Sequence, residues 1–460
     1  MRTAAATAAV GQRATPWLLT AGVVAVGLVA LLLHTDARPR LFPRLEIRSA
    51  DTHFRGRILT ADGTPLALSV SDEQRVYPLG HLAGQLVGFN VRRGGLVTNE
   101  GLEGIEGLMD EALAAGRDVT LTLDAKVQAF AEDALERAMA RSRAMWGTVV
   151  VLARDGRVLA AANAPFFDPA SPRGRPGEDP RLKNYAFREL FEPGSSVKAL
   201  TAAILLNEGV VSVDETIEVP RSTRIGDRVI HDARWHAAKD WGLAEILRHS
   251  SNVGISKLAL RLGEERFRHY LAGRLHLGDP YVLPGLVEGS PIRPIGDRVQ
   301  MANYSFGQGF MVTALHLAAA FNALSDGYYH YPRLFQEDEA RDPVPVFTNR
   351  VGPGGATADE LVRAMLTANM PEHLRISGYP LAGKSGTAQI YDEEAGAYSK
   401  TEVVASYVGL VPADEPRATV VVVLYRPQVD EEDRFGIKLA APAFREIASY
   451  LLGYLGETPR

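Results

Sequence analysis

Residues 17–33 constrain the fold of this 460-residue chain more than any other segment. They read WLLTAGVVAVGLVALLL, without a charged side chain, and Arg2 and Arg13 precede them. At about 1.5 Å of rise per residue, such a helix nearly crosses a hydrocarbon core of about 30 Å. A cleaved signal peptide is the alternative, but the HTDARPR that follows offers no pair of small residues for cleavage. We therefore predict an uncleaved transmembrane anchor at 17–34, after a short cytoplasmic tail at 1–16.

The remainder of the chain is predicted to form one soluble portion, because no second apolar run of similar length occurs. Residues 35–50 are a linker rich in Pro and Arg, and residues 51–144 hold short apolar runs broken by glycine, which indicates a small, loop-rich module. The composition, 46% apolar with a net charge of −5, allows a large core and lacks the basic surface of a nucleic-acid-binding protein. The absence of cysteine excludes disulfides, thiol catalysis and cysteine-ligated zinc.

Residues 145–457 are predicted to form one α+β domain. Residues 148–162 read as two strands around an Asp-Gly turn, and residues 404–411 and 418–426 read as two more. A final helix is predicted near 442–455. Since the strands occur at both ends of the region and helical patterns lie between them, we expect a single sheet assembled from both ends.

A strand and a helix are predicted just before this domain. VTLTLD at residues 119–124 has the composition of a strand. Asp124 is a plausible N-cap for a helix that continues to about residue 142, with apolar residues at helical spacing.

The first chemical motif lies in FEPGSSVKALTAAILLNEG, residues 191–209, where a helix is expected from near Ser195 to Gly209. Ser195 and Lys198 lie one turn apart on it and form the only S-x-x-K in the sequence. A lysine activates a serine as its base only if burial or nearby positive charge lowers the lysine pKa from about 10.4. The helix N-terminus adds N–H donors for a developing oxyanion. A serine N-cap beside a solvated lysine is the alternative.

The second motif is Ser250 and Asn252 in HSSNVGISKLAL, the only S-x-N in the sequence. In a loop before a helix, the hydroxyl passes protons and the carboxamide offers a donor and an acceptor to a substrate amide. Taken alone, such a cluster is more often a helix cap.

The third motif is LAGKSGTAQIY, residues 381–391, which we interpret as an edge strand that passes close to a ligand. Gly383 and Gly386 permit the close approach, Lys384 supplies positive charge, and Ser385 and Thr387 supply hydroxyls, a combination that suits a terminal carboxylate. A surface strand with a solvated lysine is the alternative for this motif alone.

The three motifs together, in the order S-x-x-K, S-x-N and K-S-G, resemble those of the penicillin-binding protein and serine β-lactamase superfamily. FEPGSSVK resembles the family's YEPGSTxK, and SSNVGISKLA has the form seen in division-type enzymes of the FtsI family. ANYSFGQGFMVTALHLAAAF (302–321) and GIKLAAPAFREI (436–447) resemble two further family segments. Upstream, FRGRILTADGTPLA and GLEGIEGLMD resemble motifs of class B penicillin-binding proteins. Thr60 and Ala61 depart from the Asp-Arg of the first of these, as Ser196 and Ser385 depart from the usual threonines.

The resemblance implies a transpeptidase domain with a central antiparallel sheet flanked by helices, plus an all-helical part, beyond a small N-terminal pedestal module of the class B dimerisation type. It implies that Ser195 attacks the penultimate D-Ala carbonyl of a peptidoglycan stem peptide, that Lys198 is the general base, and that Ser250 relays the proton. The backbone N–H groups of Ser195 and Thr387 would form the oxyanion hole. The implied substrate-binding residues are Asn252, Lys384, Ser385, Gly386 and Thr387.

The function implied by the resemblance is D,D-transpeptidation of stem peptides ending in D-Ala-D-Ala, with β-lactams as inhibitors and without metal or cofactor. The expected location is the cytoplasmic (inner) membrane, with a single span and the catalytic domain on the extracytoplasmic side. A SEDS-type glycosyltransferase of the FtsW/RodA kind and other division proteins are the implied partners. A septal role is favoured. An elongation-type transpeptidase, a D,D-carboxypeptidase, a β-lactamase and a non-catalytic divisome scaffold are the alternatives.

Two other patterns are set aside. Gly307-x-Gly309 lacks the third glycine and the βαβ setting of a dinucleotide loop, so we interpret it as a backbone turn. His231, His236 and Asp232 have a spacing that fits no standard zinc-protease pattern.

Overall fold

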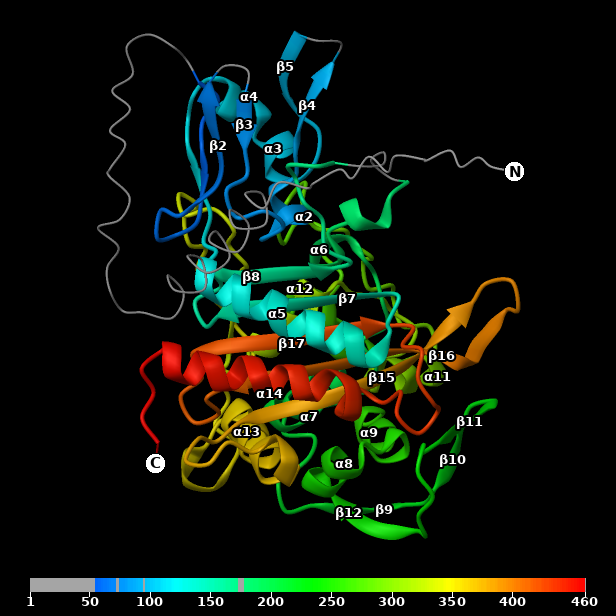
Figure 1. Ribbon diagram of the computed structural model, residues 1–460. Helices are drawn as coiled ribbons and strands as arrows, with labels where there is room; N and C mark the ends of the chain where they lie inside the picture. The colour runs from blue at the N-terminus through cyan, green and yellow to red at the C-terminus, as the bar shows by residue number, and fades with distance from the viewer. Residues whose placement is uncertain (1–53, 72–73, 94–95, 173–177, 460) are drawn as a thin grey trace, which may run out of the picture. The chain divides into compact units, whose positions relative to one another are not determined.

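The computed structural model describes residues 54–71, 74–93, 96–172 and 178–459 (Figure 1). The predicted tail, anchor and linker, residues 1–50, lie outside the described residues. Within the described ranges, no helix is both long and apolar enough to cross a membrane. The chain divides into two units, and His53–Arg460, which contains all the described residues, is the unit considered below.

A five-stranded antiparallel sheet, in the order β15-β16-β17-β7-β8, occupies the centre of this unit. Its strands are β7 (Trp146–Ala153), β8 (Val158–Ala164), β15 (Ala382–Asp392), β16 (Ala397–Val411) and β17 (Ala418–Tyr425). The hairpin β7–β8, around the Asp-Gly turn, thus joins the strands from the other end of the domain through the pairing of β7 with β17. This confirms the predicted single sheet, with β15 at one edge.

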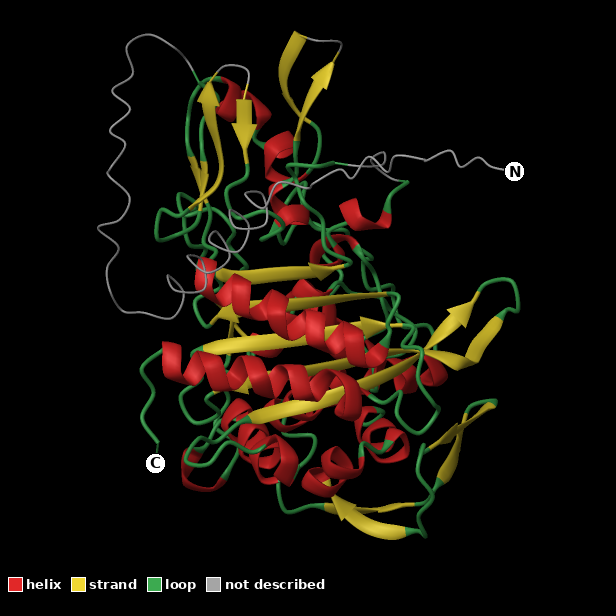
Figure 2. Ribbon diagram, viewed as in Figure 1, coloured by secondary structure: helices red, strands yellow, loops and turns green. Residues whose placement is uncertain are grey.

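Helices cover both faces of the sheet. On one face α5 (Ala125–Ser142) and α14 (Gly436–Tyr454) lie side by side across the strands, as Figure 2 shows. On the other face lies α12 (Ala314–Asn322). The strand residues alternate between the two cores: Val149 packs with α5 and α14, whereas Val150 packs with the α12 side. Both faces are therefore buried, which explains the nearly continuous apolar runs of β7 and β17.

A largely helical part lies beyond the α12 face and carries the candidate site. Its helices are α6 (Tyr185–Arg188), α7 (Val197–Asn207), α8 (Leu243–His249), α9 (Asn252–Ala259), α10 (Glu264–Arg268), α11 (Arg298–Ser305) and α13 (Ala358–Ala368). Short strand pairs accompany them: β9 (Thr216–Val219) with β12 (Lys239–Gly242), β10 (Ser222–Ile225) with β11 (Arg228–His231), and β13 (Tyr328–Tyr329) with β14 (Val344–Pro345).

The residues before α5 form a small module of short elements. They comprise β1 (Ile58–Leu59), β2 (Pro65–Ser71), β3 (Gln74–Val76), β4 (Asn90–Arg93), β5 (Leu96–Gly101), β6 (Val119–Thr120), α2 (Gly84–Val87), α3 (Gly104–Leu108) and α4 (Asp110–Ala114). At its centre the Glu106 carboxylate, fully buried, pairs with Arg55 at 2.8 Å and with Arg75 at 2.7 Å. The two class B-like upstream sequence segments thus meet at a buried ionic cluster.

Three local expectations can be compared with these elements. Asp124 caps α5 as predicted, with its carboxylate accepting from the N–H groups of Lys126 and Val127 at 2.9 and 3.0 Å. The strand expected over 119–124 is confined to β6. The final helix begins at Gly436 rather than near 442, and Pro442 lies inside it. Since α5 packs on the sheet with α14, the predicted division at 144/145 passes between elements that share one core.

Candidate active site

The turn that carries Ser195 is held by backbone contacts. Ser195 lies in a 3₁₀ turn, Gly194–Ser196, directly before α7. Gly194 has φ of 58°, and its N–H donates to the Gly307 carbonyl at 2.9 Å. Ser196 donates to the Pro193 carbonyl at 2.7 Å and is fully buried, whereas Ser195 is half-buried. Of the two adjacent serines, Ser195 is therefore the one whose side chain remains accessible.

Lys198 is the most deeply enclosed charged side chain of the cluster. It is fully buried on the first turn of α7, and its Nζ donates to Asn252 Oδ1 at 2.7 Å, to the Ser250 carbonyl, and to Ser250 Oγ at 3.3 Å. Burial lowers the Lys198 pKa well below its ordinary value, the charge of Lys384 lowers it further, and Asp232 opposes the shift. This is the condition under which a lysine amine accepts a proton near neutral pH. The Ser195 hydroxyl is not among its hydrogen-bond partners within the described residues.

Ser250 faces Lys198 from the end of α8 in an unusual backbone conformation. Its φ of 54° and ψ of 43° place it in the left-handed region, which non-glycine residues adopt rarely and at a cost. Ser251 follows as the N-cap of α9, accepting from the Gly254 N–H at 2.8 Å. The predicted S-x-N motif is thus a loop between two helices, with Asn252 as the first residue of α9.

Lys384 reaches the same hydroxyl from β15. Its Nζ donates to Ser250 Oγ at 3.0 Å and to the Ser385 carbonyl at 2.9 Å, and burial lowers its pKa to about 7. Along this edge strand the buried Lys384 and Gly386 alternate with the half-buried Ser385 and Thr387. The two hydroxyl residues therefore share the face opposite to the lysine.

β15 approaches the Gly194–Ser196 turn so closely that side chains do not fit between them. A Cβ on Gly386 would lie 2.9 Å from the Pro193 carbonyl oxygen and 2.3 Å from Ser406 Oγ. A Cβ on Gly194 would lie 3.2 Å from that of Ala388. The backbones around Ser195 and Thr387 therefore belong to two segments in contact, which is the arrangement that an oxyanion hole built from both N–H groups requires.

Known proteins with similar sequences and structures indicate the family to which this chain belongs. The family model of the penicillin binding protein transpeptidase domain matches residues 146–449. The probable peptidoglycan D,D-transpeptidase PenA of Neisseria gonorrhoeae is 30% identical over 435 residues, which cover 84% of this chain and 69% of that protein. The probable peptidoglycan D,D-transpeptidase FtsI of Caulobacter vibrioides is 31% identical, covering 86% and 68%. The crystal structure of penicillin binding protein 3 from Mycobacterium tuberculosis, complexed with aztreonam, matches with a TM-score of 0.78 at 29% identity over 88% of this chain and 97% of that chain.

This chain belongs to the penicillin-binding protein transpeptidase family. Its relatives identify it as a class B peptidoglycan D,D-transpeptidase, as the sequence motifs predict. In this transpeptidase, the helical part supplies Ser195, Lys198, Ser250 and Asn252, and the sheet supplies Lys384. The three motifs, dispersed over much of the sequence, thus meet around one hydroxyl, that of Ser250.

Asp232 is a residue of the transpeptidase site that the sequence reasoning did not assign. Its buried carboxylate accepts from Ser251 Oγ at 2.6 Å and from the Val253 N–H at 3.0 Å, and it pairs with His236 Nε2 at 2.9 Å. The sequence signal was weak, since a lone aspartate in a polar stretch is usually solvated.

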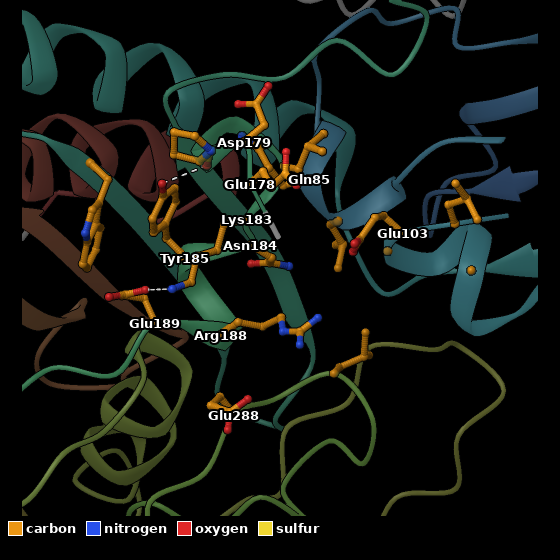
Figure 3. Close-up of a pocket in the computed structure, with 18 of the residues that line it drawn as sticks. Gln85, Glu103, Glu178, Asp179, Lys183, Asn184, Tyr185, Arg188, Glu189 and Glu288 are labelled. Carbon is orange, nitrogen blue, oxygen red and sulfur yellow. Dashed lines mark hydrogen bonds and ion pairs between the residues drawn. The ribbon is translucent and has the colours of Figure 1, made fainter. Parts of the chain in front are cut away.

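A separate cavity of about 1110 Å³ lies away from these motifs (Figure 3). It is lined from α2 and α3 on one side and from the segment around α6 on the other, and it includes none of the predicted site residues. Figure 3 shows Lys183 paired with Glu189 and the Tyr185 hydroxyl donating to the Pro180 carbonyl, at 2.8 Å. These contacts satisfy side chains within the wall of the cavity, and none of the chemistry above involves it.

Proposed function

We propose that the transpeptidase works through an acyl-serine intermediate on Ser195. Lys198 takes the hydroxyl proton as Ser195 Oγ attacks the penultimate D-Ala carbonyl of a donor stem peptide. The C–N bond to the terminal D-Ala breaks, and the proton passes from Lys198 through Ser250 to the departing amine. An amine of a neighbouring stem peptide then attacks the ester, forming the cross-linking amide and regenerating the Ser195 hydroxyl. Contacts between nucleophile and base tighten when substrate binds.

One observation carries this proposal: the fully buried Lys198 amine lies within hydrogen-bond distance of Ser250 Oγ, which also contacts Lys384. Two like charges in so small a buried volume favour loss of one proton, and the shared hydroxyl gives that proton a path. Ser385 and Thr387, half-buried on one face of β15, would bind the terminal carboxylate of the donor. Asn252 would hold the acyl-side amide, and the Ser195 and Thr387 N–H groups would stabilise the oxyanion.

The test uses the full chain in detergent with a pentapeptide donor ending in D-Ala-D-Ala and an amine acceptor, and mass spectrometry as the readout. The expected products are the cross-linked amide and an acyl-enzyme on Ser195. Ser195→Ala should abolish both, along with covalent labelling by a fluorescent penicillin, whereas Ser196→Ala should retain labelling. Release of D-Ala without transfer to the amine would favour the D,D-carboxypeptidase. A folded wild-type protein that neither labels nor turns over would favour the divisome scaffold.

We further propose that this transpeptidase acts in septal wall synthesis. The support is the SSNVG form of its S-x-N motif and the presence of relatives named FtsI in Caulobacter vibrioides and Escherichia coli. Depletion of the protein should give filamentous cells that still incorporate labelled D-amino acids along their side walls. Loss of side-wall labelling and rounding of cells would instead support the elongation-type alternative.

The membrane anchor at 17–34 and a SEDS-type glycosyltransferase as partner complete the proposal. The apolar, uncharged run supports the anchor, with the catalytic domain on the extracytoplasmic side. The full chain should stay in the membrane fraction during alkaline carbonate extraction. A chain that lacks residues 1–34 should be released into the supernatant. Co-purification of the glycosyltransferase with the full chain should survive Ser195→Ala, because docking does not require acylation.

A further inference from the structure

Asp232 lies at the end of the β10–β11 hairpin and holds the S-x-N loop from outside the three motifs. One carboxylate oxygen, Oδ1, accepts from the Val253 N–H at 3.0 Å, and the other, Oδ2, accepts from Ser251 Oγ at 2.6 Å. Ser251 and Val253 are the residues on either side of Asn252. The Asp232 carboxylate therefore holds both neighbours of Asn252, the residue whose side-chain amide faces the site.

The same hairpin also contacts Asn252 directly. The carbonyl of His231, the residue before Asp232, accepts from Asn252 Nδ2 at 3.0 Å. This bond fixes which end of the carboxamide faces inward, so that Asn252 Oδ1 accepts from Lys198 Nζ at 2.7 Å. An unbroken series of hydrogen bonds thus runs from the hairpin through Asn252 to Lys198.

Helix capping alone does not account for Asp232. Ser251 already caps α9 through the Gly254 N–H, at 2.8 Å, and α9 is packed in the core along most of its length. What the carboxylate adds is a second anchor for the loop that keeps Ser250 in its left-handed conformation. Without such an anchor, a non-glycine residue with φ of 54° would relax toward a commoner conformation and withdraw its hydroxyl from the lysines.

We propose that Asp232 is a positioning residue for the transpeptidase, one that fixes Ser250 and Asn252 in register with Lys198 and contributes a buried negative charge beside that lysine. The assignment rests on the acyl-serine function proposed above. Two further titratable groups lie here: His236, from the same loop, contacts the Asp232 carboxylate, and Lys384, from β15, faces Lys198. Asp232 alone among them favours the protonated form of Lys198.

Replacement of the carboxylate by an amide separates a positioning role from a merely structural one. Asp232→Asn keeps an oxygen that accepts from Val253 but loses the charge and the acceptor for Ser251. The loss of charge lowers the Lys198 pKa further, so Lys198 becomes neutral at lower pH. The loss of the Ser251 contact loosens the loop and lowers the maximal rate.

The experiment measures the second-order rate constant of acylation by a fluorescent penicillin across pH, on the full chain in detergent. For Asp232→Asn the maximal rate constant should fall by about 10²-fold, the size expected of a misplacement of about 1 Å, and the acid limb should move to lower pH. Asp232→Glu, which restores the charge, should return the acid limb toward the wild-type position. Asp240→Asn is the matched control, because it removes the same charge from an exposed position on β12 and should change neither quantity.

An Asp232→Asn variant with the wild-type rate constant and acid limb would overturn the assignment. Should that variant fail to give a cooperative thermal melt, Ser251→Ala provides the second test, since it removes the 2.6 Å contact and leaves the carboxylate in place. A wild-type rate constant in Ser251→Ala, or unfolding of both variants, would equally overturn it. Labelling that persists in Ser195→Ala would instead sink the acyl-serine function, irrespective of Asp232.

Discussion

Lys384 Nζ lies 3.0 Å from Ser250 Oγ at the junction of the sheet and the helical part, where Lys384 is buried and Ser250 is half-buried. The same oxygen is 3.3 Å from Lys198 Nζ, so one amine from the sheet and one from the helical part both contact this hydroxyl. A hydroxyl accepts two hydrogen bonds and donates one. Ser250 is therefore able to take a proton from one lysine and deliver it outward without moving far.

Removal of the Lys384 charge should change the pH at which the transpeptidase becomes active. Lys384 lowers the Lys198 pKa, so in Lys384→Gln that pKa rises and Lys198 is neutral only at higher pH. The acid limb of the acylation rate constant should accordingly move to higher pH, opposite to the shift expected for Asp232→Asn. Stopped-flow labelling across pH measures it.

Lys400→Gln is the matched control, because Lys400 is exposed on β16. An unshifted acid limb in Lys384→Gln would show that Lys198 is not the group titrating in that limb.

A methyl group inserted between β15 and the Gly194–Ser196 turn should abolish most activity without unfolding the protein. In Gly386→Ala the new methyl group would lie 2.9 Å from the Pro193 carbonyl oxygen of the turn and 2.3 Å from Ser406 Oγ on β16, so it would push β15 and the turn apart. Misalignment of one oxyanion donor costs about 10²–10³-fold in rate, and we expect a loss of acylation of that order. Labelling kinetics and a thermal melt on the same preparation check it.

Gly453→Ala in α14 supplies the comparison, since nothing lies within 4 Å of the added Cβ there. Normal labelling by Gly386→Ala would mean that the turn and the strand tolerate separation.

Glu132 on α5 should make stability depend on pH near neutrality. Burial raises its pKa from 4.5 to about 7, so the native state keeps a proton that the unfolded chain releases. The free energy of unfolding should therefore fall as pH rises from about 4.5 through 7, by an amount on the order of 3 kcal/mol. Glu132→Gln should flatten this slope and stabilise the protein at pH 8, measured by denaturant unfolding.

Glu136→Gln is the control variant, because Glu136 is exposed on the same helix and should leave the pH dependence of the free energy of unfolding unchanged. If both variants follow the wild-type curve, the buried carboxylate is not the source of the slope.

The ionic cluster around Glu106 should be sensitive to loss of its central charge. Glu106→Gln would leave Arg55 and Arg75 buried, at 2% exposure in the case of Arg55, without their shared carboxylate. Loss of one member of a buried pair typically costs about 3–5 kcal/mol, and urea unfolding should show a destabilisation of this size. Glu111→Gln, an exposed position on α4, should lie within about 0.5 kcal/mol of the wild type. Equal unfolding midpoints for the two variants would contradict this reading of the cluster.

The sequence predicted those features that depend on local pattern. Asp124 as a cap, the hairpin around the Asp-Gly turn and the strand predicted over 418–426 follow from neighbouring residues, and the structure confirms each. The three chemical motifs were located because their residue types are rare in this lysine-poor chain. Their family resemblance then predicted that they converge.

The features that the sequence did not predict depend on distant contacts. The role of Asp232 arises only when the β10–β11 hairpin folds back on α9, and no local pattern marks that contact. Likewise, no local pattern indicated that the Lys384 amine would donate to Ser250 Oγ while Ser385 and Thr387 lie on the opposite face of the strand. The helix predicted near 442–455 begins at Gly436, six residues earlier.

The pairing of β7 with β17 also governs when a newly made chain becomes an enzyme. Ribosomes complete Ser195 and Lys198 long before β15 and β17 exist, and β7 has no partner on its β17 side until then. Pairing between segments so distant in sequence is slow, since the intervening chain must first be brought together. A partly synthesised chain therefore carries Ser195 without the strand that completes the site, and we expect reactivity toward peptides only once the last fifth of the molecule has been made.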